Sequence, residues 1–329
     1  MNLTVLFGAF MGQLDASIVP LAYPAIGARF NAGQSVEWVS LAYLITLVAL
    51  LVPIGGFADK VGRKAVYLGG FAVFAGASLA CCAAPALEWL VAARVVQAVG
   101  AAMLQANSVA LIVTNVPRER MRQALGVQAG AQALGLALGP LLGGVLVDRY
   151  GWSAVFAINV PVGIVAIVAG WFLLPDTKGD GRVELTPLRD ARVITGLVGV
   201  LVAYAVMFAP MVVLPSTLRE PLTRIGLLVA VLPAGFALAA TLLPKMSRST
   251  GIAVSTVGGL SLFTALPPAV SLLTLGIGLG IVVPASSKAV MARIPSGNAG
   301  IGSGLVNMAR GIGTAAGVAV ASLLVHSFQ

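Results

Sequence analysis

The chain has 329 residues, of which 59% are hydrophobic and only 9% are charged, and its mean hydropathy is +1.00. These values exclude an ordinary soluble globular protein and indicate a protein that lies in a membrane. The net charge of +9 would suggest a nucleic-acid or acidic partner in a soluble protein, but here it is spread over alternate loops, so we expect no nucleic-acid partner.

Apolar stretches long enough to cross a bilayer, roughly 20 residues each, follow one another along the chain. In the first half we expect them at 3–25, 38–57, 65–84, 89–114, 123–147 and 152–174. In the second half we expect them at 193–214, 224–243, 251–266, 269–287 and 300–325. The sequence thus predicts an all-α polytopic membrane protein of about 11 spans: an N-terminal six-helix bundle (1–174), a cytoplasmic linker (175–192) and an abbreviated C-terminal helical bundle (193–329).

Lysine and arginine gather in every second loop, which predicts a cytoplasmic N-terminus because basic loops stay on the cytoplasmic side. The enriched loops hold Lys60, Arg63, Lys64, Arg118, Arg120, Arg122, Lys178, Arg182, Arg189, Arg192, Lys245, Arg248, Lys288 and Arg293. The opposite loops hold Arg29, Arg149, Arg219 and Arg224. No cleavable signal peptide is expected, because the first apolar run carries Asp15 and lacks a basic flank. The expected location is the plasma membrane, as a multi-pass protein of the bacterial inner membrane.

The second half is shorter than the first. Its third span has about sixteen residues before Pro267, few for a crossing, and no twelfth span follows the eleventh. Either segments are missing from the sequence, or the chain is a truncated or degenerate relative of a protein with six spans in each half. The halves also resemble each other weakly: a shift of 178 residues superposes Gly126, Gly135 and Gly139 on Gly304, Gly313 and Gly317, pairing the fifth span with the eleventh.

Three charged residues remain inside the predicted spans: Asp15, Arg94 and Arg310. Asp15 lies some 21 Å along the first helix, counting about 1.5 Å per residue from Met1. An ionised carboxylate at that depth is costly, so its charge should depend on proton supply or on a cationic partner. We interpret Asp15 as a coupling or substrate-binding group; the alternative is an acid in a wet cavity that merely pairs with an arginine.

The two arginines have different surroundings in the predicted spans. Arg94 lies about 9 Å from the outer start of the fourth span, a distance from which its long side chain could partly snorkel to the surface. Arg310 could contact an anionic or polar substrate, or pair with backbone carbonyls. Polar residues in other spans could line a substrate cavity or form interhelical hydrogen bonds. They are Gln13, Gln97, Gln105, Asn107, Gln128, Gln132 and Asn159.

The segment from Gly55 to Lys64, GGFADKVGRK, lies between the second and third spans. Gly62 permits a tight turn, the basic residues, Arg63 and Lys64 among them, hold the loop at the cytoplasmic face, and Asp59 can meet a helix N-terminus or an arginine. We interpret these residues as a conformational latch between the two halves; the alternative is a generic basic loop. The segment resembles the loop signature of the major facilitator superfamily.

Further stretches are similar to the drug:proton antiporter branch of that superfamily. They are LDASIV at 14–19, EWV at 37–39 with Tyr43, RVVQAVG at 94–100, GLALGPLLGG at 135–144, and Trp152 to Gly163. The resemblance implies the major facilitator fold of two helical bundles and proton coupling through Asp15 and Arg94. For the motif of Gly135, Gly139, Pro140, Gly143 and Gly144 it implies exchange rather than uptake. Apart from the resemblance, glycines four apart share one helix face and allow close packing, and Pro140 favours a kink.

The function expected from these motifs is proton-coupled export of small, amphipathic or drug-like molecules, as in multidrug efflux and antibiotic resistance. The alternatives are an uptake symporter on the same fold and a transport-inactive receptor or assembly subunit. The expected partners are substrate, protons and the bilayer, and a monomer is expected. No enzyme, cofactor or metal is expected: soluble-enzyme motifs are missing, Cys81 and Cys82 are adjacent packing residues, and His326 is interpreted as interfacial.

Overall fold

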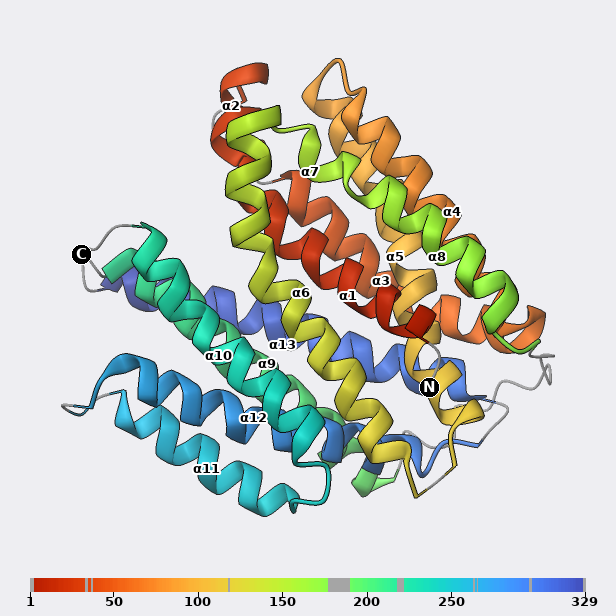
Figure 1. The fold of residues 1–329 in the computed structure, drawn as a ribbon, viewed down its shortest axis with the longest axis vertical. Helices are drawn as coiled ribbons and strands as arrows, with labels where there is room; N and C mark the ends of the chain where they lie inside the picture. The colour runs from red at the N-terminus through yellow and green to blue at the C-terminus, as the bar shows by residue number, and fades with distance from the viewer. Residues whose placement is uncertain are drawn as a thin grey trace. The chain divides into compact units, whose positions relative to one another are not determined.

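The computed structural model describes residues 3–32, 35–36, 38–117, 119–176, 190–217, 222–262, 264, 266–295 and 298–327. All regular elements in these ranges are helices, which confirms the all-α prediction (Figure 1). The predicted linker lies mostly outside the described residues.

Helices cover every stretch that the hydropathy of the sequence predicts. In the first half they are α1 (Leu3–Ile18), the 3-10 turn η1 (Val19–Ala22), α2 (Tyr23–Phe30), α3 (Trp38–Val61), α4 (Arg63–Cys82), α5 (Leu87–Asn115), α6 (Met121–Tyr150), α7 (Ala154–Ala157) and α8 (Asn159–Leu173). In the second half they are α9 (Ala191–Thr217), α10 (Leu222–Leu242), α11 (Arg248–Ser261), α12 (Pro268–Met291) and α13 (Ala299–Ser327).

Helix length and hydropathy identify fewer membrane spans than the sequence predicts. Among the described residues, 6 helices are long and apolar enough to cross a membrane, and up to 8 if each bent pair is one span. The eleven-span count therefore stays a prediction. The short ninth span is present as α11, whose 14 residues reach about 21 Å at 1.5 Å per residue.

Two predicted spans are bent in the structure. The first is broken, with an angle of 59° between Val5–Ile18 and Tyr23–Phe30. Pro20, which has no backbone N–H to donate, is the second residue of the intervening turn η1, and the single apolar stretch predicted at 3–25 gives no sign of this break. The kink that Pro140 predicts is present, because α6 bends by 41° between Gln123–Gly139 and Leu142–Tyr150.

The chain forms two compact units. Unit 1 comprises Met1–Asn115, Gly135–Val183 and Pro295–Gly304. Within it, α5 packs against α1, α3 and α4, and α8 packs on α4 and α1. In Figure 1 α4 and α8 run side by side. Buried apolar residues such as Ile18, Val39 and Phe156 form a core where these helices converge.

Unit 2 comprises Val116–Leu134, Glu184–Ile294 and Leu305–Gln329. Within it, α12 takes the place that α5 has in unit 1, because it packs against α9, α10 and α11. Helices α6 and α13 each contribute one part to unit 1 and another to unit 2. The order of packing thus repeats between the halves of the chain.

The glycine correspondence found in the sequence has a structural basis. In unit 1, a side chain at Gly135 of α6 would meet the backbone carbonyl of Phe10 in α1. In unit 2, a side chain at Gly313 of α13 would meet the backbone carbonyl of Leu201 in α9. Because α1 and α9 are the first helices of their halves, the two contacts are equivalent, which confirms the pairing of the fifth span with the eleventh.

Candidate functional site

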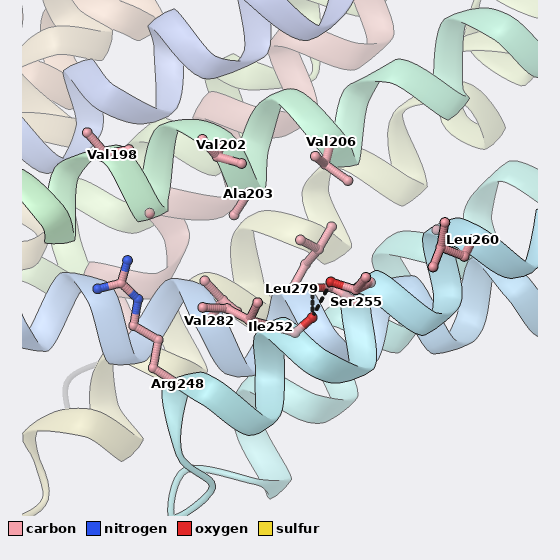
Figure 2. Close-up of a pocket in the computed structure, with 13 residues that line it drawn as sticks. Val198, Val202, Ala203, Val206, Arg248, Ile252, Ser255, Leu260, Leu279 and Val282 are labelled. Atoms are coloured by element: carbon pink, nitrogen blue, oxygen red, sulfur yellow. Dashed lines mark hydrogen bonds between the residues drawn. The ribbon is translucent and has the colours of Figure 1, made fainter.

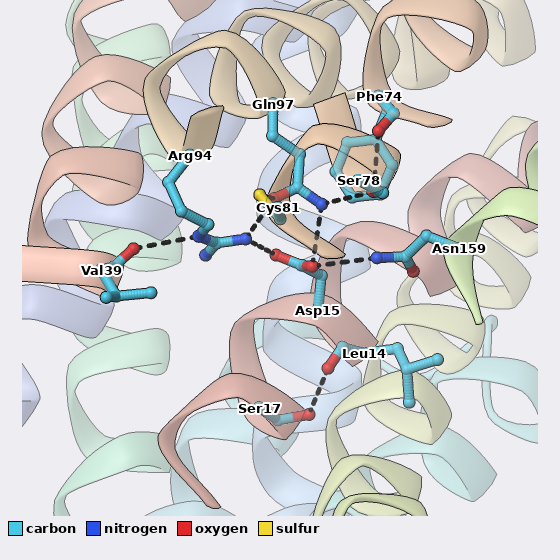
Figure 3. Close-up of polar contacts among 10 residues, drawn as sticks. All are labelled: Leu14, Asp15, Ser17, Val39, Phe74, Ser78, Cys81, Arg94, Gln97 and Asn159. Atoms are coloured by element: carbon cyan, nitrogen blue, oxygen red, sulfur yellow. Dashed lines mark hydrogen bonds and ion pairs between the residues drawn. The ribbon is translucent and has the colours of Figure 1, made fainter. Parts of the chain in front are cut away.

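A buried ion pair lies at the centre of unit 1. Nη1 of Arg94, on α5, donates to Oδ2 of Asp15, on α1, over 2.6 Å (Figure 3). The Nε of Arg94 donates to the backbone carbonyl of Val39, on α3, over 2.9 Å. Asp15 and Arg94 are both fully buried. Arg94 therefore points inward, and the alternative that it snorkels to the surface is wrong.

Two amide side chains complete the surroundings of Asp15. Nε2 of Gln97 and Nδ2 of Asn159, on α8, each donate to Oδ1 of Asp15 over 3.2 Å. Gln97 also accepts from Arg94 and donates to Oγ of Ser78, on α4, over 2.8 Å. The hydrogen-bond network around the carboxylate of Asp15 thus joins five helices, α1, α3, α4, α5 and α8. Four residues that the sequence singles out meet in it: Asp15, Arg94, Gln97 and Asn159.

Aromatic rings cover the guanidinium of Arg94. The ring centroid of Tyr43 lies 4.0 Å from Cζ of Arg94, and that of Phe156 lies 5.7 Å away. A desolvated cation over an aromatic face is stabilised by the ring quadrupole. The hydroxyl of Tyr43 is buried and makes no hydrogen bond within the described part of the chain. Tyr43 therefore serves the pair through its ring. In the sequence Tyr43 is marked only as part of a motif, and Ser78 is marked only as a hydroxyl on an apolar helix.

A second polar cluster lies in unit 2. Nη1 of Arg310, on α13, donates to Oε1 of Gln132, on α6, over 2.7 Å and to Oδ1 of Asn307 over 3.1 Å. The hydroxyl of Tyr204, on α9, donates to the same oxygen of Gln132 over 3.3 Å. Arg310 thus pairs with side-chain amides, whereas the sequence suggested substrate or backbone carbonyls. Tyr204 and Asn307 were not among the predicted site residues.

The remaining candidates for a substrate cavity are scattered over three helices. Gln13 is half-buried on α1, and Gln105 and Gln128 are buried on α5 and α6. Nδ2 of Asn107 donates over 2.8 Å to the backbone carbonyl of Met103 in its own helix. Their role as a cavity lining stays a prediction.

The predicted latch residues form a well-defined contact in unit 1. Asp59, near the end of α3, accepts hydrogen bonds from the backbone N–H groups of Gly300 and Ile301 over 2.9 and 3.1 Å. The same carboxylate lies 2.8 Å from Nη2 of Arg63. Both partners suggested by the sequence, a helix N-terminus and an arginine, are therefore present at once, since Gly300 and Ile301 lie in the first turn of α13.

Two glycines make this contact possible. Gly62 joins α3 to α4 at φ 116°, a conformation that a residue with a side chain rarely adopts. Gly55 of α3 lies against the backbone carbonyl of Gly300, so the two helices approach closely. Lys64, in contrast, forms an ion pair of 3.0 Å with the exposed Asp176.

The glycine motif of α6 packs on α1 through part of its length. A side chain at Gly139 would overlap the hydroxyl of Ser17, which donates to the carbonyls of Leu14 and Gly135 over 3.1 and 3.4 Å. Gly143 is buried, whereas a side chain at Gly144 would have no neighbour within 4 Å. The motif therefore contains packing positions and one open position. Of Pro140, only the backbone is described.

A largely apolar groove of about 490 Å³ lies between α9, α11 and α12 in unit 2 (Figure 2). Its one charged lining residue is Arg248, whose Nη2 donates to the carbonyl of Thr195 over 2.9 Å. The sequence did not predict this groove. No group of three metal-ligand side chains comes together in the described ranges, and the thiols of Cys81 and Cys82 are free.

A family model settles where this architecture belongs. The model described as Major Facilitator Superfamily matches residues 5–318. The chain belongs to the Major Facilitator Superfamily. Members of this superfamily are membrane transporters and not enzymes, and the long apolar helices of this chain agree with a multi-pass membrane protein. The resemblance drawn from the latch segment is confirmed.

Several curated relatives in the superfamily are named for transport or resistance. The chain is 34% identical over 172 residues to the riboflavin transporter RibZ of Clostridioides difficile, which is 52% of this chain and 38% of that protein. It is 36% identical over 179 residues to the tetracenomycin C resistance and export protein of Streptomyces glaucescens, 54% of this chain and 33% of that protein. The matched stretches thus span only 33–38% of the length of these two relatives.

Among solved structures, the human organic anion transporter MFSD10 (TETRAN) matches with a TM-score of 0.77. The match covers 98% of this chain and 93% of that one, at 16% sequence identity. At this identity the likeness establishes the fold alone, and it confirms the major facilitator fold.

Proposed function

We propose that this superfamily member exports small, amphipathic or drug-like molecules in exchange for protons. The observation that carries the proposal is the buried pair of Asp15 and Arg94. A carboxylate there has its charge balanced by one guanidinium and oriented by two amide donors, so a change in those neighbours changes its affinity for a proton. The names of the tetracenomycin C relative and of the methylenomycin A resistance protein of Streptomyces coelicolor, 36% identical over 173 residues, support export.

The proposed cycle is alternating access between an N-terminal bundle (1–174) and a C-terminal bundle (193–329), joined by the cytoplasmic linker 175–192. When the site opens outward, Asp15 takes up a proton and substrate leaves. When it opens inward, the proton departs and new substrate binds. One charge moving through about 100 mV releases on the order of 2.3 kcal/mol, enough for a substantial substrate gradient. The chain works as a monomer in the bacterial inner membrane with its N-terminus in the cytoplasm.

In this cycle the Asp59 contact acts as a latch. Its hydrogen bonds to Gly300 and Ile301 join the end of α3 to the start of α13, helices from different halves of the sequence. Such bonds are individually worth about 1.5–3 kcal/mol when one partner is charged, so they can break and re-form during transport. The kinked α6, which contributes to both units, is the second element expected to move.

The test is substrate-dependent proton flux in proteoliposomes that hold an entrapped pH dye. A panel of acidic, basic and neutral amphipathic compounds is added in turn, and compounds that release protons are then assayed for pH-driven efflux. Asp15→Asn should abolish this efflux, while Asp176→Asn, which removes an exposed acid, should leave it intact. Unchanged efflux in Asp15→Asn would refute the assignment of Asp15.

One observation favours a second candidate, uptake by proton symport. The relative RibZ is named a riboflavin transporter, and that name gives no direction of transport. An imposed inward proton gradient decides between the two: expulsion of substrate from the proton-poor side supports exchange, and accumulation there supports symport. If no compound moves protons at all, the chain is instead a transport-inactive receptor or assembly subunit.

A further inference from the structure

The cluster around Arg310 contains a buried positive charge with neutral partners. Only 3% of Arg310 is exposed. Its described partners are the amide oxygens of Gln132 and Asn307 and the ring of Tyr204, whose centroid lies 5.7 Å from Cζ. In unit 1 the other arginine inside a predicted span, Arg94, has the carboxylate of Asp15 at 2.6 Å.

Unit 2 offers no carboxylate on its helices to balance this charge. After residue 190 the sequence contains one acid, Glu220, which lies outside the described residues. The described acids of this unit, Glu119 and Asp190, precede the first residues of α6 and α9. Within unit 2, the described parts of the helices that surround Arg310 therefore carry no acidic side chain.

Arginine cannot resolve this situation by losing its proton, because its guanidinium stays charged in proteins. A buried charge is costly unless it is paired and hydrogen-bonded. Two donors of the cluster also lack an acceptor among the described residues, Nε of Arg310 and Nε2 of Gln132. An anion with two oxygens would supply the missing charge and both acceptors.

Aromatic side chains border the same cluster. Tyr204 stacks on Phe208 and meets Phe236 edge to face, with centroids 6.5 Å apart in both pairs. Phe236 is buried on α10. The cluster thus combines a guanidinium with ring faces, which suits a planar acid that has an apolar body.

We propose that Arg310 and Gln132 bind the anionic oxygens of an amphipathic aromatic acid, a carboxylate or sulfonate. The binding of this acid at Arg310 does not depend on the proposed function. Its transport as a substrate does. In this arrangement Asp15 of unit 1 binds and releases the proton, and the cluster around Arg310 in unit 2 selects substrates that carry a negative charge.

The first test compares 1-naphthoate with 1-naphthamide, which share a ring system and differ in charge, at pH 7. Binding to the purified full chain in detergent is measured by titration calorimetry. The wild type should bind the acid at least roughly ten-fold more tightly than the amide. Arg310→Gln should remove this preference, and Arg248→Gln, which deletes another arginine of the same unit, should keep it. Equal binding by the wild type, or a preference that survives in Arg310→Gln, would overturn the proposal.

Gln132→Glu provides a second test that does not depend on the folding of Arg310→Gln. It places a carboxylate where the amide oxygen now lies 2.7 Å from Nη1. The variant should unfold at a higher temperature than the wild type without ligand and should lose naphthoate binding. Binding equal to the wild type would contradict the inference. Asp15→Asn should keep the preference for the acid, so a failure of proton coupling and a failure of this site give different results.

Discussion

The carboxylate of Asp15 and the guanidinium of Arg94 meet at 2.6 Å with 0% and 1% of their side chains exposed. Because water does not reach either group, each charge depends on the other and on the fixed donors around them. Protonation of Asp15 would leave Arg94 with a carbonyl and an amide as its remaining acceptors. The two residues must therefore be altered and interpreted together.

Replacing Tyr43 separates the role of its ring from that of its hydroxyl. The hydroxyl has no described partner, whereas the ring covers Arg94 at 4.0 Å. We expect Tyr43→Phe to change the free energy of unfolding by less than about 0.5 kcal/mol, and Tyr43→Leu to lower it by about 2 kcal/mol. Chemical denaturation in detergent measures both. A larger loss for Phe than for Leu would show that the hydroxyl matters.

Arg94→Lys keeps the positive charge but changes its geometry. A lysine has no donor at the position of Nε, so the carbonyl of Val39 loses a partner that is now 2.9 Å away. We expect the variant to lose about 1–3 kcal/mol of unfolding free energy, the cost of an unsatisfied buried group. Arg149→Lys, at an exposed position of α6, is the matched control and should be neutral. Equal effects at the two positions would argue against a specific role for Nε.

How far the sequence predicts this site is clear from its members. Asp15 and Arg94 stand out because charges are rare in spans, and their partners Gln97 and Asn159 are polar residues on apolar helices. Ser78 and the carbonyl of Val39 could not be predicted, because nothing in a hydroxyl or a backbone group shows which helix will face it. The ion pair between Asp15 and Arg94 could not be predicted either, because the two residues are 79 positions apart and meet only through the packing of α1 on α5.

Asp59→Ala should expose the first turn of α13. The first N–H groups of a helix have no partner within the helix, so those of Gly300 and Ile301 depend on the carboxylate of Asp59. We expect hydrogen exchange at these two amides to rise by about ten-fold or more, with amides in the middle of α13 unchanged. Mass spectrometry of deuterated peptides measures the rates. Asp176→Ala is the control, and a similar rise there would point to a general loosening.

Two glycines of the α6 motif should respond oppositely to alanine. At Gly139 the added methyl group overlaps Ser17, so Gly139→Ala should cost about 1–3 kcal/mol of unfolding free energy. At Gly144 the methyl group meets nothing within 4 Å, so Gly144→Ala should gain about 0.5–1 kcal/mol from helix propensity. Thermal unfolding in detergent ranks the two variants. If both were neutral, the contact between α6 and α1 would be looser than the structure shows.

The fold follows from sequence more completely than the site does. Runs of apolar residues mark the stretches that form helices, and Pro140 marks the bend of α6. The break after Ile18 escapes prediction because Pro20 alone does not decide whether a helix bends or ends. The same limit applies to Arg310: its position in an apolar stretch shows that it is buried, but only the packed helices show that neutral amides surround it.

The contacts of Gly135 and Gly313 show that the same helix packing occurs in both halves of the chain. Asp15 on α1, in contrast, has no equivalent acidic residue on α9. Such a pattern is what a duplicated gene leaves when its copies keep their skeleton and specialise in their side chains. New cargo preferences can then evolve in the second copy without disturbing the ionisable centre of the first.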